Sequence, residues 1–213
     1  MLKTMNKPLA DYIAAIEAEN HTPDPSRIER LKPLIDWIRD RVRQSQTIDL
    51  VYICTHNSRR SHFGQVWGKT AAHRHGLSSV RTWSGGTEAT AFHPNAMAAL
   101  SRAGFQVSPA QDASVRNALY HIHYDEQQPP IACFSKTYDD AVNPAQDFVA
   151  VMTCTDAEKN CPFISGASLR VGLPYEDPRF SDGTPQQEQA YDLCCRTIAR
   201  ESLWLFAQVK SQL

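Results

Sequence analysis

The feature of this sequence with the clearest chemical potential is a thiol and a guanidinium on one short polar loop. Cys54 follows a short apolar run, and Arg60 and Ser61 follow it after five residues, Thr55, His56, Asn57, Ser58 and Arg59. Residues 62–75 contain no proline and are followed by Gly76, which predicts that the loop opens directly into a helix. The order strand, polar loop and helix N-terminus is therefore expected around Cys54.

This arrangement is typical of an anion-binding site. Consecutive backbone N–H groups of such a loop converge on one point, and the helix dipole adds positive potential there. A thiol at that point is expected to lose its proton readily, and the planar fork of Arg60 can hold two oxygens of a tetrahedral oxyanion. The sequence therefore predicts that Cys54 is a thiolate nucleophile beneath a phosphate-like group bound by residues 55–60.

Two further cysteines follow another apolar run. Cys154 directly follows residues 151–153, and Cys161 comes seven positions later. If this segment is helical, the two Cα atoms lie roughly 10 Å apart, whereas a disulfide needs about 4.4–6.8 Å. A disulfide between them would require the segment to unwind, as in a redox switch. The alternative, that one or both are packed apolar cysteines, remains open, while a zinc site is disfavoured by the spacing.

A carboxylate farther along the chain could also take part in catalysis. Asp177 precedes Pro178, which biases its backbone towards an extended conformation and can project the carboxyl group from a loop. Asp177 is therefore a candidate general acid for a leaving group above the anion site. The alternative is an Asp-Pro pair that only forms a turn.

The elements that must position these residues alternate between short apolar runs and helical patterns. We expect strands at 48–53, 80–83, 148–153 and 169–173, and helices at 61–75, 93–103 and 186–209. This alternation predicts an α/β fold, a three-layer sandwich with a central parallel sheet of about four strands. Ligands of such sheets bind at the carboxyl ends of the strands, where Cys54 and Cys154 are expected.

Two regions lie outside this alternation. Residues 1–47 are predicted to form an N-terminal helical extension of the domain 48–213. Residues 106–147 are interpreted as an insertion, with a hairpin of strands 118–124 and 131–134 followed by a short helix at 135–141. His121 and His123 share one strand face, but no third ligand accompanies them, so we expect an ordinary surface and no metal site.

Composition limits the remaining function classes. The chain has 213 residues, 42% of them hydrophobic, and a net charge of −1, so charge favours neither nucleic acid nor a membrane surface as partner. We expect a cytoplasmic protein without a signal peptide or membrane span. Six cysteines are too few and too unevenly placed for a disulfide framework, so they are expected to be catalytic, redox-active or buried: Cys54, Cys133, Cys154, Cys161, Cys194 and Cys195.

Taken together, these motifs resemble a known family. The loop 54–61 is similar to the C-x-x-x-x-x-R-S loop of low-molecular-weight protein tyrosine phosphatases and of the thioredoxin-coupled arsenate reductases that share their fold. The chain looks more like the reductases, because Cys154 and Cys161 match their second and third redox cysteines. Further segments that resemble reductase motifs are 84–88, 93–96 and 177–188. The resemblance covers about residues 48–213 apart from the insertion.

Two loop residues depart from the family pattern. His56 stands where the family usually has glycine, a residue that allows a wider range of backbone conformations. Arg59 replaces the cysteine found next to the loop arginine, so it removes one thiol and adds a positive charge.

The resemblance implies a mechanism without a cofactor. Cys54, stabilised by the loop amides, Arg60 and Ser61, attacks arsenate while Asp177 protonates the departing oxygen. Cys154 then attacks Cys54 and releases arsenite, and exchange with Cys161 leaves a disulfide that a thioredoxin-type partner reduces.

Two alternatives remain open. The same loop could hydrolyse phosphate monoesters as a tyrosine phosphatase, with water in place of Cys154. The unusual residues His56 and Arg59 also allow a noncatalytic module that binds an oxyanion or a phosphoprotein.

Overall fold

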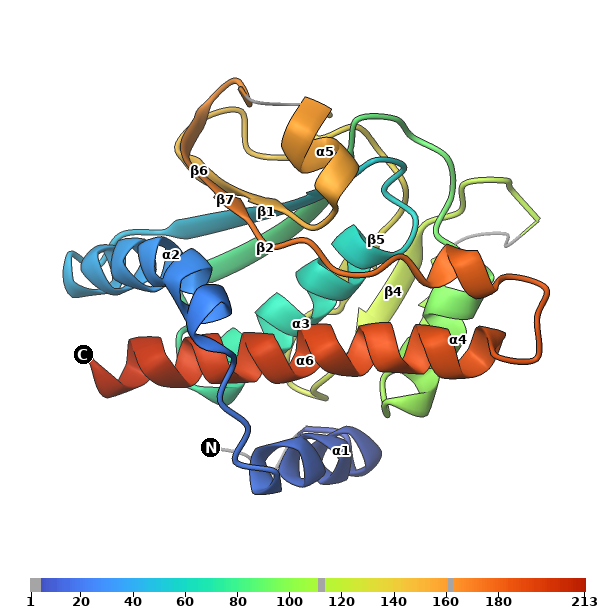
Figure 1. Cartoon of the computed structure of the whole chain (residues 1–213), viewed down its shortest axis with the longest axis horizontal. Helices are drawn as coiled ribbons and strands as arrows, with labels where there is room; N and C mark the ends of the chain where they lie inside the picture. Colours follow the sequence, from blue (N-terminus) through green and yellow to red (C-terminus); the bar gives the residue numbers. More distant parts are fainter. Residues whose placement is uncertain (1–4, 111–113, 161–162) are drawn as a thin grey trace.

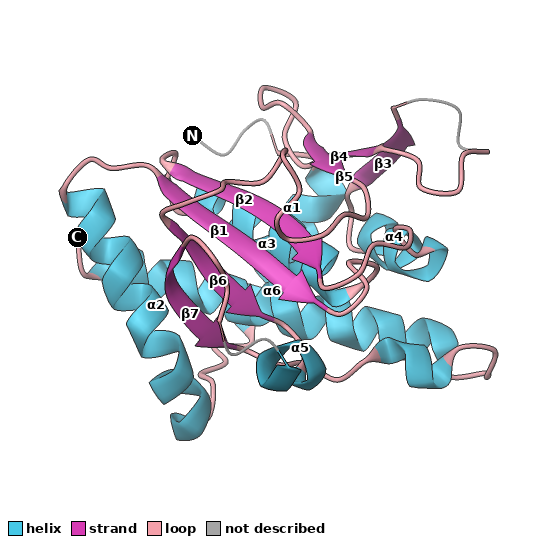
Figure 2. Cartoon of the chain, turned by 90° about the horizontal axis from the view of Figure 1, so that it is seen from above, coloured by secondary structure: helices cyan, strands magenta, loops and turns pink. Residues whose placement is uncertain are grey.

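The computed structural model describes residues 5–110, 114–160 and 163–213. Within these residues a parallel sheet in the order β2-β1-β6-β7 forms the centre of the molecule (Figure 2). Its strands are β1 (Ile48–Cys54), β2 (Val80–Gly86), β6 (Phe148–Met152) and β7 (Ala167–Gly172). The four-stranded parallel sheet expected from the sequence is confirmed.

Helices lie on both sides of this sheet, which confirms the three-layer arrangement. In Figure 1, α3 (Arg60–Arg74) and α6 (Gln187–Ser211) lie below the strands, and α5 (Thr155–Asn160) lies above them. Helix α4 (Pro94–Arg102) packs on α6 near the carboxyl edge of the sheet. In the described part of the chain, no helix is long and apolar enough to span a membrane.

Strand β1 is buried along its whole length because it is packed on both faces. Leu50 and Tyr52 belong to the hydrophobic cluster shared with α3 and α6, whereas Val51 and Ile53 belong to a second cluster on the α5 side. Helix α3 comes close to the strand through Gly64, where an added Cβ would lie 2.3 Å from the Tyr52 ring. This packing places the start of α3 directly after the end of β1.

The N-terminal residues form two helices that pack on the same core. Helix α1 (Lys7–Ala18) buries Leu9, Ile13 and Ile16. Helix α2 (Pro25–Arg43) begins at the cap residue Asp24, whose carboxylate accepts a hydrogen bond from the N–H of Arg27, and it continues through Pro33. It lies against α6 and β7.

The insertion differs in part from its prediction. The hairpin is present as β4 (Tyr120–His123) and β5 (Ile131–Cys133), and β3 (Gln106–Pro109) adds a third antiparallel strand. The prediction of a short helix at 135–141 is wrong. That segment runs beside the end of β2 instead, where the Gly86 N–H donates to the Lys136 carbonyl and the Gly86 carbonyl accepts from Tyr138 N–H. These hydrogen bonds satisfy backbone groups that a helix would have paired internally.

Candidate active site

Cys54 is the last residue of β1 and lies opposite Gly86 of β2 in the sheet register. Its sulfur is 3.1 Å from the Ser61 hydroxyl oxygen, which itself accepts a hydrogen bond from the Asn57 side-chain amide at 2.8 Å. Because the amide nitrogen of Asn57 can only donate, the Ser61 proton is left to point at the sulfur. The three side chains thus form a short chain of donors that ends on the Cys54 sulfur.

The loop between Cys54 and α3 is held by contacts to its carbonyl oxygens from outside. The backbone N–H groups of Thr87, Glu88 and His93 donate to the carbonyls of residues 54, 55 and 58 at 2.8–3.2 Å. The hydroxyls of Thr90 and Ser135 donate to the carbonyl of residue 56. The carbonyls are thereby turned away from the centre of the loop.

The backbone N–H groups of residues 55–60 remain available at the N-terminus of α3. None of the turn, loop and cap hydrogen bonds found among the described residues uses one of them as donor. Asn57 takes the left-handed conformation, φ 44°, and its side-chain oxygen accepts from the Lys136 N–H, while His56 keeps a negative φ. The family glycine is therefore not needed at position 56 for this loop shape. The arrangement can bind an oxyanion.

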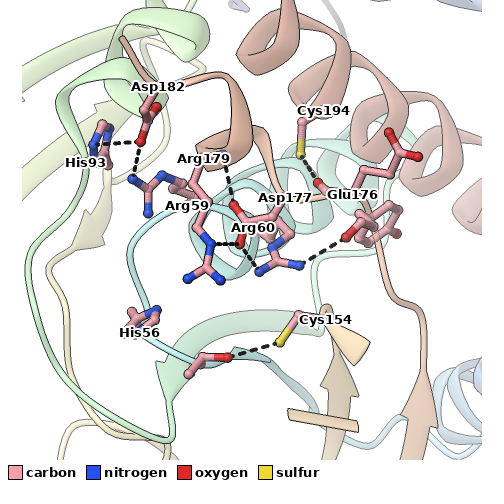
Figure 3. Close-up of polar contacts among 12 residues, drawn as sticks. His56, Arg59, Arg60, His93, Cys154, Glu176, Asp177, Arg179, Asp182 and Cys194 are labelled. Atoms are coloured by element: carbon pink, nitrogen blue, oxygen red, sulfur yellow. Dashed lines mark hydrogen bonds and ion pairs between the residues drawn. The ribbon is translucent and has the colours of Figure 1, made fainter. Parts of the chain in front are cut away.

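Arg60 and Asp177 meet beside this loop, as Figure 3 shows. The Arg60 guanidinium pairs with the Asp177 carboxylate and donates to the Tyr175 carbonyl at 3.0 Å. Asp177 also accepts from the Arg179 N–H as the cap of a 3-10 helix, Pro178–Ser181. Both sequence interpretations of Asp177 are thus compatible with its position, since it forms the turn and lies next to the loop arginine.

Arg59 points to one side of the loop rather than to solvent. It donates to the Tyr191 hydroxyl at 2.6 Å and to the Asp182 carboxylate at 2.8 Å. His93 stacks on Tyr191, and burial together with the charge of Arg59 lowers the pKa of this imidazole. Nothing local in the sequence connects Asp182 or Tyr191 with Arg59, 123 and 132 positions away, so the sequence patterns missed both.

A cavity of about 570 Å³ opens beside this group. His56, Ser58 and Arg59 border it from the loop side. Residues farther along the chain complete the wall, among them Phe92, Arg116, Arg179 and Phe180. A group bound at the anion loop would therefore have room on the Arg59 side for whatever it carries.

Cys154 lies next to the loop at the same sheet edge. Its sulfur is buried, 3.5 Å from the Thr55 hydroxyl, and accepts a hydrogen bond from the Ala157 N–H at the start of α5. The segment after Cys154 is helical through Asn160, as the distance argument assumed. Cys161 lies outside the described residues, so its place relative to Cys154 stays a prediction.

The remaining cysteines are buried in the core. Burial raises the pKa of Cys133 and of Cys195 to about 12, and the Trp67 indole donates to the Cys195 sulfur. Cys194 donates to the Glu176 carbonyl. These environments keep all three thiols protonated, as expected for packing residues.

His121 and His123 lie on β4 with perpendicular rings whose centroids are 6.3 Å apart. Across residues 5–110, 114–160 and 163–213, no group of three side chains has a metal-binding arrangement.

Comparison with known proteins finds arsenate reductases among the relatives in sequence. No family model matches the chain. An arsenate reductase of Shouchella clausii is 29% identical over 139 residues, which cover 65% of this chain and 79% of the relative. An arsenate reductase of Bacillus licheniformis is 26% identical over 159 residues, 75% of this chain and 94% of the relative.

Among solved structures, the fold is similar to that of a low-molecular-weight phosphotyrosine phosphatase from Vibrio cholerae O395. The TM-score is 0.50 at 12% identity, over 75% of this chain and 94% of the other. The β1 loop and its parallel sheet, the relatives in sequence and this common fold agree with one another. The chain therefore has the fold of a low-molecular-weight phosphotyrosine phosphatase and is similar in sequence to arsenate reductases.

Proposed function

We propose that this protein is an arsenate reductase that reduces arsenate to arsenite through a covalent adduct on Cys54. The observation that carries the proposal is the second thiol beside the anion loop, with the Cys154 sulfur 3.5 Å from the hydroxyl of Thr55, the residue after Cys54. A phosphatase needs only one thiol, whereas the reduction of arsenic(V) to arsenic(III) takes two electrons from a pair of thiols. The sequence similarity to arsenate reductases supports the same conclusion.

In the first step the loop binds arsenate and Cys54 attacks it. The N–H groups of residues 55–60 and the Arg60 guanidinium hold the oxyanion above the sulfur, and the Ser61 hydroxyl stabilises the thiolate. Binding draws Arg60 towards the anion, which frees the Asp177 carboxyl group from their ion pair. The released Asp177 carboxylate takes up a proton from solvent and passes it to the departing oxygen, and a bond between sulfur and arsenic replaces one between arsenic and oxygen.

In the second step Cys154 attacks the sulfur of Cys54. The bond between Cys54 and arsenic breaks, its electron pair stays on arsenic, and arsenite leaves while a Cys54–Cys154 disulfide forms. The Ala157 N–H donates a hydrogen bond to the Cys154 sulfur, which lies beside Thr55 of the loop. Exchange with Cys161 moves the disulfide to Cys154–Cys161, and a thioredoxin-type dithiol reduces it.

A second candidate function, hydrolysis of phosphate monoesters, is favoured by the cavity beside Arg59. Phosphate and arsenate are both tetrahedral oxyanions, and the 570 Å³ space has room for the leaving group of an ester, which arsenate lacks. In this case water replaces Cys154 as the second nucleophile, and Asp177 protonates the leaving oxygen.

The deciding measurement is arsenate turnover with thioredoxin in the variants Cys154→Ser and Cys161→Ser. We expect both to lose turnover, with Cys133→Ser as a control because Cys133 is also buried but contacts Gln65 instead of the loop. Full reductase activity in both variants would refute the thiol relay. Robust hydrolysis of phosphate esters that needs only Cys54 and Asp177 would establish the phosphatase instead.

A further inference from the structure

The segment that carries Asp177 borders a cavity on one side. A cavity of about 940 Å³ lies between residues 174–181, residues 21–24 and the side of α6 that contains Cys194. Because a cavity offers no atoms to pack against, van der Waals contacts on that side contribute little to the position of the segment. On that side, its position depends on polar contacts.

One of these polar contacts comes from the N-terminal helix α2. Arg27 donates from Nη1 to the carbonyl oxygen of Pro174 at 3.2 Å. The same guanidinium forms two hydrogen bonds to the Glu201 carboxylate of α6, one of them at 2.8 Å from Nη2, and it lies 4.7 Å above the centre of the Tyr175 ring. Arg27 thus joins three separate parts of the chain.

Tyr175 continues this chain of contacts to the anion loop. Its hydroxyl donates to Glu201, and burial together with that carboxylate raises the pKa of Tyr175 well above its ordinary value, so the hydroxyl stays a donor. Its carbonyl accepts from the Arg60 guanidinium at 3.0 Å, two residues before Asp177. A displacement of residues 174–175 would therefore move both the acceptor that orients Arg60 and the carboxylate that pairs with it.

We propose that Arg27 is a positioning residue of the anion site, which it serves from outside by holding residues 174–177 in the place where Arg60 and Asp177 meet. The inference rests on the proposed function only in that it takes residues 54–61 as the anion site. It applies to a reductase and to a phosphatase alike, because both need Arg60 and Asp177. It also means that the N-terminal extension contributes to the geometry of the anion site.

The test compares Arg27→Gln with Arg41→Gln. Arg41 is a matched control, since it is also on α2 and forms a two-point ion pair with a distant carboxylate, Asp147, away from the loop. Arg27→Lys keeps the charge but not the planar fork. The double variant Arg27→Gln/Glu201→Gln avoids leaving a buried carboxylate unpaired, so it separates positioning from lost stability.

Two readouts are measured in each variant. The first is the affinity for inorganic phosphate, taken from its protection of Cys54 against iodoacetate, with the Cys54 peptide followed by mass spectrometry. The second is kcat/KM for arsenate with thioredoxin and for p-nitrophenyl phosphate. Because small displacements of a reacting group cost up to ~100-fold in rate, we expect Arg27→Gln and the double variant to lose about 10- to 100-fold in turnover and about tenfold in phosphate affinity. Arg27→Lys should fall between them and the wild type, and Arg41→Gln should stay within about twofold.

The results separate the two proposals. If phosphate does not protect Cys54 in the wild-type protein, the anion site itself is refuted, and the role of Arg27 with it. If the wild type is protected but Arg27→Gln and the double variant match Arg41→Gln in both readouts, only the positioning role is refuted.

Discussion

At the scale of single residues, His62 is a buried imidazole in the first turn of α3, next to the anion loop. The side chain is fully buried under the anion loop, with its Nδ1 atom 3.3 Å from the Ser84 hydroxyl and its ring 4.1 Å from the Phe92 ring centroid. Its Nε2 atom has no hydrogen-bond partner among the described residues. Burial, and then the nearby charge of Lys136, lower the pKa of this imidazole to about 3.

This imidazole makes stability depend on pH. Between pH 6.5 and about 3 the unfolded chain carries a proton on His62 that the folded chain does not, so the free energy of unfolding falls as the pH is lowered through this window. One such group accounts for about 2 kcal/mol between pH 7 and pH 5. Urea titrations at both pH values should show that His62→Asn loses this share. The exposed His21→Asn should keep the wild-type dependence, and an unchanged dependence in His62→Asn would contradict the assignment.

The sequence predicted the candidate site residues that lie close together along the chain. Cys54, Arg60 and Ser61 share one loop, so their spacing alone placed them together. The contacts of Arg27 with Pro174 and of Arg59 with Asp182 span 147 and 123 positions. No local pattern encodes such pairs, because they depend on how separate elements pack. The sequence alone therefore gives no reason to single out Arg27.

At the scale of elements, the end of β2 forms part of the site. The sequence predicted a strand that stops at residue 83, because serine and glycines usually mark a turn. The strand continues to Gly86, since residues 84–86 pair in parallel with the end of β1. The predicted helix at 135–141 failed for a related reason, because β2 and Asn57 compete for its backbone groups. Strands with continuous apolar runs were predicted correctly, and the errors are at polar sheet edges.

Gly86 gives this element a direct test. A Cβ at this position would lie 2.3 Å from the Glu88 carbonyl oxygen and 2.7 Å from both the Thr55 carbonyl oxygen and the Asn57 nitrogen, all of them backbone atoms. Gly86→Ala should therefore displace the loop, abolish phosphate protection of Cys54 and cost about 1–3 kcal/mol of stability.

The control for this variant is Gly76→Ala, where φ is +73° and no atom lies within 4 Å of the added Cβ. It should lose about 1 kcal/mol from backbone strain and keep full phosphate protection. The loop argument fails if Gly86→Ala still binds phosphate as the wild type does.

At the scale of the whole molecule, the N-terminal helices and the sheet share one hydrophobic cluster. Leu9 of α1 and Ile38 of α2 belong to the same cluster as Leu50 of β1 and Phe206 of α6. Elements joined by one core usually unfold together. We therefore expect a single cooperative transition in which the extension and the sheet lose their structure at the same urea concentration.

Ile38→Ala tests this cooperativity. Ile38 is fully buried, so its truncation should cost ~2–5 kcal/mol, and tryptophan fluorescence and far-ultraviolet circular dichroism should shift together. Glu29→Ala, at an exposed position of the same helix, should change stability by less than about 0.5 kcal/mol. Two separate transitions, with α2 unfolding first, would show that the extension is an independent unit.

The contacts that other segments make with the anion loop order it during folding, so the loop loses its conformational entropy then and not on binding. Its carbonyls are held by residues 87, 88, 90 and 93 of the β2–α4 connection and by residue 135 of the β5–β6 connection. The loop is therefore already ordered in the folded protein before an oxyanion binds. Binding does not have to offset the loss of loop entropy, so the affinity is higher. Natural variation at Thr90 or Ser135 can consequently tune affinity without touching the substrate.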